Sequence, residues 1–460
     1  MLDAYKAYLE RTTRERRIPG VAALVKRGGE TLFDEGVGYA DREALRPVTP
    51  DTIFGIGSLT KSFTALAIMQ LVDRGDLRVT DPAADYLPAL ASSSNHDLTR
   101  ITLHHLLTNT SGLPPLPYLN GALARSVLAD ASLELLEMKP EKYAVPLDTY
   151  DELISALAAD APRLLRAPGT LFSYSNDGFA MLGRIVELAS GEDYEEYVRR
   201  HVLEPLGMTR SVFDPSELAA LGDSTELYSY IGGFERVEPT PGWWEAPAMT
   251  SAGFLKSTTR DLARYAEVYL GKRPDVLSPA SLEAMTAPHA RTWPGRHYGY
   301  GMMVQPDYHG HKVVEHGGNI KGVGAWLTVF QGGDVVSALL SNITGGPVSE
   351  MAWTGANLGA GLSAETRRQE FATVPLSEQQ LARLVGRYVS GEDVDVTVRR
   401  GADGGPEVVV GKQMLPTRSV AEDSLVVDAN GQDSLMEFID AGPTGYGAVT
   451  FGFRVLERVA

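Results

Sequence analysis

A serine and a lysine three residues apart are the first residues in this sequence that could do chemistry together. Ser58 and Lys61 stand in the stretch GSLTK, directly before a run of apolar residues. Side chains at this spacing share one face of a helix, so the Lys61 amine can reach the Ser58 hydroxyl. Apolar surroundings lower the pKa of a lysine, which suits a general base that activates a serine nucleophile. A helix-capping serine followed by a surface lysine would show the same pattern.

A second group, Tyr174-Ser175-Asn176, lies between a Pro-Gly loop and a predicted helix over residues 179–189. A tyrosine close to an ammonium group can have a lowered pKa and relay a proton. Asn176 could hold Lys61 or a substrate carbonyl. A structural tyrosine and a helix-capping asparagine are the simpler alternative.

A third group consists of His316, Gly317, Gly318 and Asn319, directly after a predicted strand over residues 311–315. Two glycines at a strand edge allow the backbone of a substrate to approach closely. The backbone N–H groups of Asn319 and Ser58 could then stabilise an oxyanion, the latter at the positive end of a helix. An ordinary loop histidine beside two glycines is the alternative.

The hydrophobic pattern predicts the elements that would position these groups. Strands are predicted over residues 21–26 and 31–38 with a Gly-Gly turn between them, and over residues 311–315, 325–330 and 335–340. The segment 58–73 suits a mostly buried helix, and residues 119–162 look like an inserted acidic helical piece. Strands near both ends with helices between them predict an α+β fold, with one antiparallel sheet built from both ends.

The character of the sequence changes after Ser363. A polar linker over residues 364–374 precedes a short predicted helix over 379–384 and strand-like runs over 394–399, 407–410, 424–427 and 449–455. These short runs predict a small separate β domain of the sandwich or barrel type. We therefore expect a catalytic domain over residues 1–363 and a β domain over residues 375–460.

Composition excludes several classes of protein. The 460 residues contain no cysteine, which removes disulfides, thiolate nucleophiles and cysteine metal sites. A net charge of −17 argues against nucleic acid or an anionic membrane as partner. No apolar run reaches the length of about 18 residues that a membrane span needs, and the N-terminus lacks the apolar core of a signal peptide. These features predict a cytoplasmic location, or a periplasmic or secreted one if a signal peptide has been removed from the N-terminus.

The three groups occur in an order that resembles the serine β-lactamase and penicillin-binding-protein superfamily, specifically its class C or CubicO-type serine hydrolases. Residues 77–88, 101–114, 168–187, 204–208 and 251–265 resemble the same family. The resemblance spans roughly residues 10–345. The C-terminal part is similar to the lipocalin-like β-barrel domain appended to some of these hydrolases, with LVGRY at residues 384–388 as the cue.

The resemblance implies a β-lactamase/transpeptidase-like fold, in which helices flank an antiparallel sheet and form an additional subdomain. It also implies catalytic roles. Ser58 would be the acylated nucleophile, and Lys61 and Tyr174 would share the general-base and general-acid work. Which of the two performs which step stays open. Asn176 would orient Lys61 and the substrate amide.

By the same resemblance, His316, Gly317 and Gly318 form the third motif and bind substrate, and the N–H groups of Ser58 and Asn319 form the oxyanion hole. Penicillin recognition uses a lysine and a hydroxyl residue in this motif, and His316 and Gly317 replace them here. A neutral histidine does not substitute for an ammonium group. The departure favours an esterase or peptidase acting on short substrates, including ones with D-residues.

Two other functions stay open. One is a β-lactamase or penicillin-binding protein with DD-peptidase activity, and the other is a catalytically silent sensor that keeps the fold. The expected partner is a small ester, peptide or amide, and the C-terminal domain could mediate homo-oligomerisation. No cofactor is expected. A metal site is disfavoured because His309 and His311 project to one side of a strand and His316 to the other.

Overall fold

The computed structural model describes residues 2–429, 432–443 and 445–459, and it divides the chain into two units. The first unit comprises Met1–Thr108, Tyr118–Ala161 and Asn176–Thr366. The second unit comprises Asn109–Pro117, Pro162–Ser175 and Arg367–Ala460. Two short segments from the first half of the sequence therefore group with the C-terminal residues.

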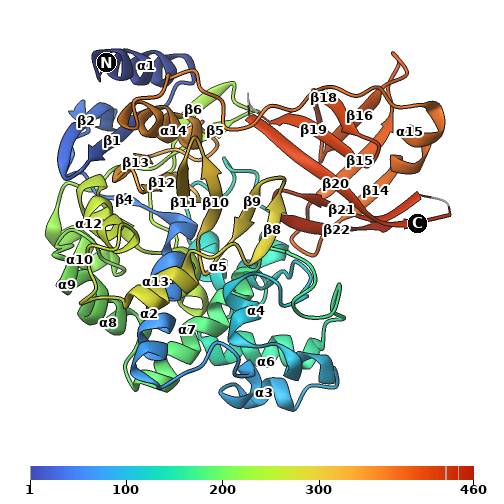
Figure 1. Ribbon diagram of the computed structural model, residues 1–460, viewed down its shortest axis with the longest axis horizontal. Helices are drawn as coiled ribbons and strands as arrows, with labels where there is room; N and C mark the ends of the chain where they lie inside the picture. The colour runs from blue at the N-terminus through green and yellow to red at the C-terminus, as the bar shows by residue number, and fades with distance from the viewer. Residues whose placement is uncertain (1, 430–431, 444, 460) are drawn as a thin grey trace. The chain divides into compact units, whose positions relative to one another are not determined.

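The first unit is built on a nine-stranded antiparallel sheet with the order β3-β2-β1-β13-β12-β11-β10-β9-β8 (Figure 1). Its strands are β1 (Gly20–Arg27), β2 (Glu30–Asp41), β3 (Arg46–Pro47), β8 (Ala290–Trp293), β9 (Arg296–Tyr298), β10 (Met303–Tyr308), β11 (His311–Ile320), β12 (Val323–Gln331) and β13 (Val335–Ser341). Because β1 pairs with β13, the two ends of this unit meet in the middle of the sheet. The predicted antiparallel sheet and the hairpin of β1 and β2 are confirmed.

Every residue of β13 is buried, so both faces of this sheet are covered. On one face, α1 (Leu2–Glu15) and α14 (Val348–Gly359) pack on the strands, and Tyr5, Leu339 and Met351 share one apolar cluster. Elsewhere α12 (Thr259–Tyr269) contacts the central strands β1, β12 and β13. Its Tyr265 ring stacks on Phe63 of α2 (Thr60–Arg74) at a centroid distance of 3.8 Å. The sheet thereby supports the helix that carries Lys61.

The predicted buried helix is confirmed as α2, with Gly75 at φ +82° in its C-terminal cap. Ser58 lies just before it, in a single 3₁₀ turn over Gly57–Leu59. The hydroxyl of Thr60 donates to the Gly57 carbonyl at 2.7 Å and accepts from the Leu255 N–H at 3.2 Å. This turn therefore has hydrogen bonds on both sides and holds Ser58 in one orientation.

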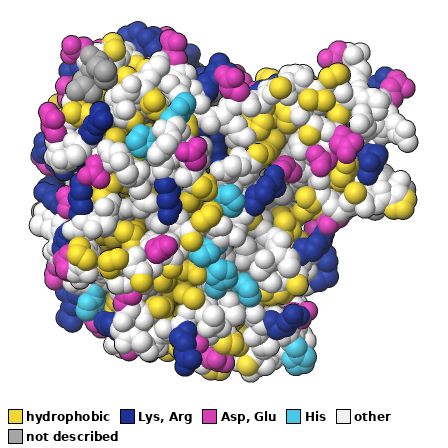
Figure 2. Space-filling model, in the orientation of Figure 1, with side chains coloured by type: hydrophobic (Ala, Val, Ile, Leu, Met, Phe, Trp, Pro, Cys, Tyr) yellow, Lys and Arg dark blue, Asp and Glu magenta, His cyan; other side chains and the backbone are white. Residues whose placement is uncertain are grey.

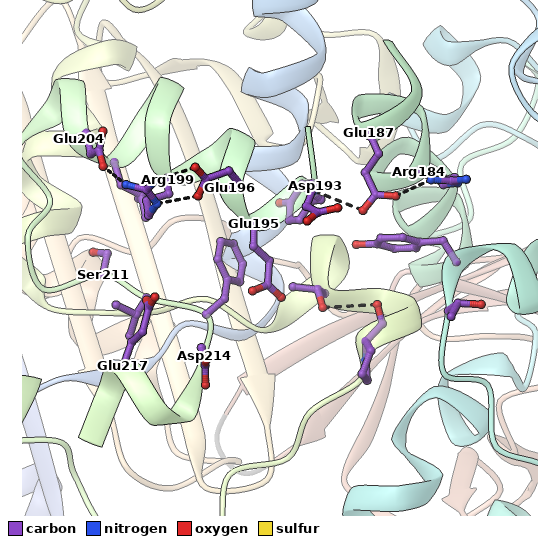
Figure 3. Close-up of a pocket in the computed structure, with 18 of the residues that line it drawn as sticks. Arg184, Glu187, Asp193, Glu195, Glu196, Arg199, Glu204, Ser211, Asp214 and Glu217 are labelled. Carbon is purple, nitrogen blue, oxygen red and sulfur yellow. Dashed lines mark hydrogen bonds and ion pairs between the residues drawn. The ribbon is translucent and has the colours of Figure 1, made fainter. Parts of the chain in front are cut away.

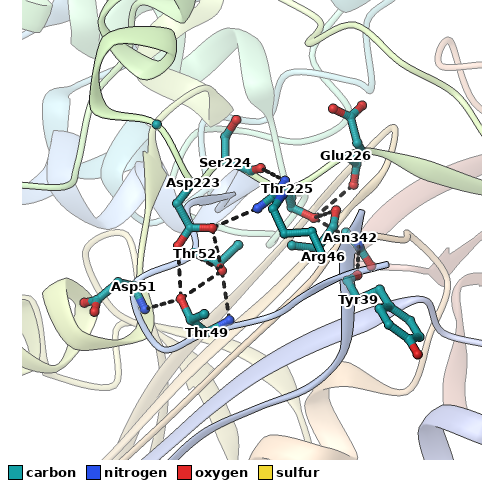
Figure 4. Close-up of polar contacts among 12 residues, drawn as sticks. Tyr39, Arg46, Thr49, Asp51, Thr52, Asp223, Ser224, Thr225, Glu226 and Asn342 are labelled. Atoms are coloured by element: carbon teal, nitrogen blue, oxygen red, sulfur yellow. Dashed lines mark hydrogen bonds and ion pairs between the residues drawn. The ribbon is translucent and has the colours of Figure 1, made fainter. Parts of the chain in front are cut away.

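The loop that leads from β3 to Ser58 is anchored by one carboxylate (Figure 4). Asp223 accepts hydrogen bonds from Arg46 at 2.8 Å and from the Thr49 hydroxyl at 3.0 Å. The Thr49 N–H in turn donates to the Thr52 hydroxyl at 2.9 Å. After this loop, β4 (Phe54–Gly55) pairs with β7 (Lys256–Ser257), which brings the segment before Lys256 alongside Gly57 and Ser58.

The second unit contains a nine-stranded antiparallel sheet with the order β17-β16-β15-β14-β22-β21-β20-β19-β18. Its strands are β14 (Gly386–Val389), β15 (Asp395–Arg400), β16 (Pro406–Val410), β17 (Gln413–Leu415), β18 (Thr417–Ala421), β19 (Ser424–Ala429), β20 (Gln432–Gly442), β21 (Gly445–Phe451) and β22 (Arg454–Val459). Contacts between β16 and β18 bring the two ends of the sheet together into a nearly closed barrel. The predicted lipocalin-like β-barrel is confirmed.

One predicted strand of the barrel is wrong. Residues 449–455 form the end of β21, a turn and the start of β22, not a single strand. The turn residues Gly452 and Phe453 both have positive φ, at +54° and +65°. Phenylalanine rarely adopts that conformation. Gly452 was therefore the only turn signal in the stretch FGFR, which stands inside an apolar run.

The two early segments of the second unit pack on the barrel strands. Leu165 shares an apolar cluster with Ala448 and Val455. A Cβ atom added at Gly391 would fall 2.2 Å from the Pro115 carbonyl oxygen, so the backbones touch there. These contacts place the segment that carries Tyr174 in the same unit as the barrel.

Candidate active site

Lys61, at the start of α2, lies within hydrogen-bond distance of three oxygen atoms. Its Nζ is 3.1 Å from Ser58 Oγ, 2.9 Å from Asn176 Oδ1 and 2.5 Å from the Ala252 carbonyl oxygen. The lysine is fully buried. Because amide and backbone carbonyls can only accept, a neutral amine can donate one hydrogen to each of them and direct its lone pair at the Ser58 hydroxyl. The arrangement suits an amine that receives the serine proton.

Asn176 reaches Lys61 from the first residue of α7 (Asn176–Ser190). This helix packs against α2, and its N-terminal position aims the amide across the gap between the helices. The third acceptor, the Ala252 carbonyl, belongs to α11 (Thr250–Gly253), the segment directly before β7. The sequence gave no signal for Ala252, because its contribution is a backbone atom.

The third predicted group lies inside a strand and not after one. The sequence predicted a strand over residues 311–315 that ends before His316, but β11 continues through Gly317, Gly318 and Asn319 to Ile320. Pairing with β12 runs to the end of β11, from Lys312 to Ile320. Glycines often mark the end of a strand. Here they lie within β11, where the Trp326 ring and the Ile56 backbone leave no room for larger side chains at these positions.

The glycines allow close approach of other groups. A Cβ atom added at Gly318 would fall 1.8 Å from the Ile56 carbonyl oxygen and 2.8 Å from the Ser58 nitrogen. One added at Gly57, which has φ +51°, would fall 2.7 Å from the Asn319 nitrogen. The backbone N–H groups of Ser58 and Asn319 therefore lie in one small region, as an oxyanion hole requires.

His316 is buried and its ring is held by the protein on both sides. Its Nδ1 lies 2.6 Å from the Gly317 carbonyl, which can only accept, so Nδ1 carries the proton. Nε2 lies 3.1 Å from the hydroxyl of Tyr298 and accepts from it. Burial, and then the positive charge of Lys61, lower the pKa of His316 to about 3. The imidazole is thus neutral at physiological pH and carries no fixed positive charge for a substrate carboxylate.

Tyr174 belongs to the second unit, two residues before Asn176 in the sequence. Its backbone N–H donates to the Phe453 carbonyl at 2.9 Å, and the Arg454 guanidinium lies 4.6 Å from the centre of its ring. Glu392 holds Arg454 through an ion pair of 2.7 Å. The first unit thus brings together Ser58, Lys61, Asn176 and the third group, whereas the second unit holds Tyr174. The sequence does not predict the contacts of Phe453 and Arg454 with Tyr174, because neither residue forms a motif with it.

Asn109 braces the same segment. Its side-chain oxygen accepts from the Ser175 N–H at 2.9 Å, and its carbonyl accepts from the Ser173 N–H at 2.8 Å. Asn109 has φ +55°, a conformation that asparagine tolerates better than most residues. It therefore fixes the backbone on both sides of Tyr174.

A large cavity lies elsewhere in the first unit (Figure 3). Its volume is about 810 Å³, and acidic side chains crowd its wall, among them Glu187, Asp193, Glu195, Asp214 and Glu217. The described residues that line it include none of the predicted site residues. The cavity is therefore separate from the predicted active site.

Two observations concern metals and membranes. Glu315, which stands next to His316, accepts hydrogen bonds from the indoles of Trp326 at 3.0 Å and Trp353 at 2.7 Å. Among the residues that the structure describes, no group of three or more His, Cys, Asp or Glu side chains is placed to hold a metal ion. Within the same residues, every helix is too short or too polar to cross a lipid bilayer.

The fold and the known relatives identify the chain as a serine hydrolase. The profile of the Beta-lactamase family matches residues 5–361, and the chain belongs to this family.

Known relatives cover much of the chain. It is 30% identical over 339 residues to "Penicillin-binding protein 4" of Amycolatopsis lactamdurans, a match that covers 71% of this chain and 82% of that protein. It is 37% identical over 217 residues to "Esterase EstB" of Burkholderia gladioli, which covers 46% of this chain and 51% of that protein. The solved structure of the octameric penicillin-binding protein homologue from Pyrococcus abyssi is similar over 99% of both chains, with 28% identity and a TM-score of 0.72.

Proposed function

We propose that this protein hydrolyses small esters or short amides and peptides through an acyl-enzyme on Ser58. The observation that carries the proposal is the position of Lys61 Nζ, 3.1 Å from Ser58 Oγ and hydrogen-bonded to the carbonyls of Asn176 and Ala252. A nucleophile with an adjacent base, itself oriented by a third group, is the arrangement that covalent catalysis requires.

In the proposed reaction, Ser58 Oγ attacks the acyl carbonyl and its proton passes to Lys61. The negative charge that develops on the carbonyl oxygen is stabilised by the N–H groups of Ser58 and Asn319. The C–O or C–N bond then breaks, and the leaving group takes a proton relayed by Lys61 and Tyr174. Water attacks the acyl-enzyme in the second half of the reaction and releases the acid.

We expect a fluorophosphonate probe to attach to Ser58 in the wild-type protein. Such a probe reacts only with an activated serine, and its phosphonyl group mimics the tetrahedral transition state. Peptide mass spectrometry should find the adduct on the peptide that contains Ser58, and the Ser58→Ala variant should stay unlabelled. Equal labelling of both proteins would exclude Ser58 as the nucleophile.

The neutral His316 bears on the substrate class. Together with Gly317, it replaces the cation and the hydroxyl that recognise a penicillin carboxylate. We therefore favour substrates without that carboxylate. Asn176 and the backbone of β11, which is open beyond Glu315 on the side of β10, would hold the rest of the acyl chain.

Short p-nitrophenyl esters are accordingly expected to be hydrolysed faster than nitrocefin, a chromogenic β-lactam. A panel of esters, L- and D-aminoacyl anilides and β-lactams, run with Ser58→Ala as the blank, checks this order by kcat/KM. Faster turnover of nitrocefin would instead support a β-lactamase. Preference for D-aminoacyl anilides would place the enzyme with D-specific peptidases.

The relative named penicillin-binding protein 4 favours one second candidate, a DD-peptidase or β-lactam-binding protein. In that case nitrocefin or penicillin would acylate Ser58, and the resulting acyl-enzyme would hydrolyse slowly. A catalytically silent sensor is disfavoured, because Ser58, Lys61 and Tyr174 are all present.

On the face drawn in Figure 2, basic and acidic side chains are interspersed, which agrees with a small molecule as the principal partner.

Self-association through the C-terminal barrel belongs to the same proposal. The similar structure from Pyrococcus abyssi is described as octameric. Sedimentation of the full chain would measure the oligomeric state.

A further inference from the structure

A buried ion pair stands at the turn that follows the third motif. Lys321 and Gly322 form the two-residue turn between β11 and β12. The Lys321 ammonium lies 2.5 Å from Asp130 Oδ2, and both side chains are only 2% exposed. Asp130 comes shortly after α5 (Tyr118–Leu128), 191 residues earlier in the sequence. The pair therefore ties the tip of the β11–β12 hairpin to the inserted helical piece.

The remaining hydrogen-bonding groups of the pair also have partners. The indole N–H of Trp244 donates to Asp130 Oδ2 at 2.6 Å, and the Ser132 N–H donates to Asp130 Oδ1 at 2.8 Å. Lys321 donates in addition to the Pro241 carbonyl at 3.1 Å, and its ammonium lies 5.3 Å from the centre of the Trp244 ring. Three separate segments thus meet in one satisfied polar network, which we name the Lys321–Asp130–Trp244 clasp.

A buried ion pair is a poor device for stability alone. Removing two charges from water costs several kcal/mol per ion, and apolar replacements often stabilise a protein more. Burial lowers the pKa of Lys321, whereas the hydrogen bonds to Asp130 outweigh its burial and lower the pKa of that carboxyl. What a fully satisfied buried network provides is rigidity, because moving either partner would leave a buried charge without its hydrogen bonds.

The clasp holds the end of β11, which lacks a strand partner on one side. The register between β10 and β11 ends at Met303 and Glu315, whereas pairing with β12 continues to Ile320. Among the described strands, residues 316–320 are therefore paired on one side only. Asn319 lies in this stretch, two residues before Lys321, and its nitrogen packs against Gly57.

We propose that the Lys321–Asp130–Trp244 clasp is a positioning device that fixes the Asn319 N–H in the oxyanion hole. The inference rests on the proposed function, because it assigns Asn319 the role of donor to the developing oxyanion. Lys321 itself has no place at the reacting atoms, since its ammonium is turned into the network and buried there. It acts through the short turn that connects it to Asn319.

The test is a kinetic comparison of Lys321→Met with the wild type on a p-nitrophenyl ester. A misplaced oxyanion donor costs up to about a hundredfold in turnover and little in ground-state binding. We expect kcat to fall by about 10- to 100-fold with KM within about threefold. Lys321→Arg, which keeps the charge and can reach Asp130, should recover most of the loss.

The matched control is Lys312→Met in β11, the strand that leads to Lys321. Lys312 stands near the opposite end of β11, where it donates to the Thr286 hydroxyl at 2.8 Å. This variant loses the same side-chain atoms but leaves the clasp intact, so its kcat should stay within about twofold of the wild type. Equal loss of kcat in both variants would mean general loosening of the sheet and would overturn the proposal.

A second variant decides the matter if Lys321→Met does not fold. Trp244→Phe keeps an aromatic ring and removes the indole N–H that donates to Asp130. It should lower kcat by about three- to tenfold without a change in KM, and an unchanged kcat would overturn the proposal. Fluorophosphonate labelling distinguishes a failure of the proposed function from a failure of the clasp proposal. An unlabelled wild type refutes the proposed function, whereas a labelled wild type with a fully active Lys321→Met refutes only the clasp.

Discussion

Replacing Lys61 by methionine is expected to lower kcat for a p-nitrophenyl ester by about a thousandfold or more. Methionine has nearly the same length and fills the same buried space, but it has no nitrogen to accept the Ser58 proton. The loss should appear in kcat more than in KM, because the lysine acts on the nucleophile. Stopped-time assays at substrate saturation measure this directly.

Two further variants separate the base from other roles of Lys61. Lys61→Arg keeps a positive charge that cannot be given up near neutral pH, so it should be as inactive as Lys61→Met if the lysine is a base. Lys256 supplies the matched control, since it is also buried, at 3% exposure, and also donates to a backbone carbonyl, that of Phe213. Lys256→Met should lose stability but keep kcat within a few-fold of the wild type. A Lys61→Met enzyme with at least a tenth of the wild-type kcat would contradict the mechanism.

Replacing Gly318 by alanine is expected to lower kcat by about a hundredfold. The added methyl group would stand 1.8 Å from the Ile56 carbonyl oxygen and 2.8 Å from the Ser58 nitrogen, so β11 must move away from the turn that carries Ser58. Both proposed oxyanion donors then separate. The measurement is kcat on the same ester, together with the melting temperature to show that the variant is folded.

Gly442→Ala serves as the control for this variant. The nearest atom to a Cβ added at Gly442 is the Gly445 carbonyl oxygen at 3.5 Å, an ordinary contact, and the position lies in strand β20 of the second unit. Its kcat should match that of the wild type. If Gly318→Ala keeps full activity, β11 does not supply an oxyanion donor as we propose.

The parts of the site that depend on local spacing could be predicted from the sequence. The three-residue interval between Ser58 and Lys61 fixes their distance once a helical turn forms, whatever surrounds it. The hydrophobic pattern likewise predicted β1, β2 and β13 and the helix α2. These features depend on neighbours in the chain, and the structure confirms them.

Features that depend on distant segments could not be predicted. Pairing with β12 continues the strand β11 through Gly317 and Gly318. Both positions are glycine because Trp326 and the Ile56 carbonyl leave no room for side chains, and neither neighbour is local. Lys321 and Asp130 are 191 residues apart, and each alone reads as a surface charge. Ala252 contributes only a backbone oxygen, which no residue type signals.

The route of the chain through its two units has a consequence for evolution and for protein engineering. The sequence passes from the first unit to the second at residues 109, 162 and 367, and returns at residues 118 and 176. The last return falls between Ser175 and Asn176, inside the second motif itself. The C-terminal barrel is therefore not a cassette that recombination can exchange at one junction. A graft that transfers residues 367–460 alone would leave behind two of the three segments of that unit.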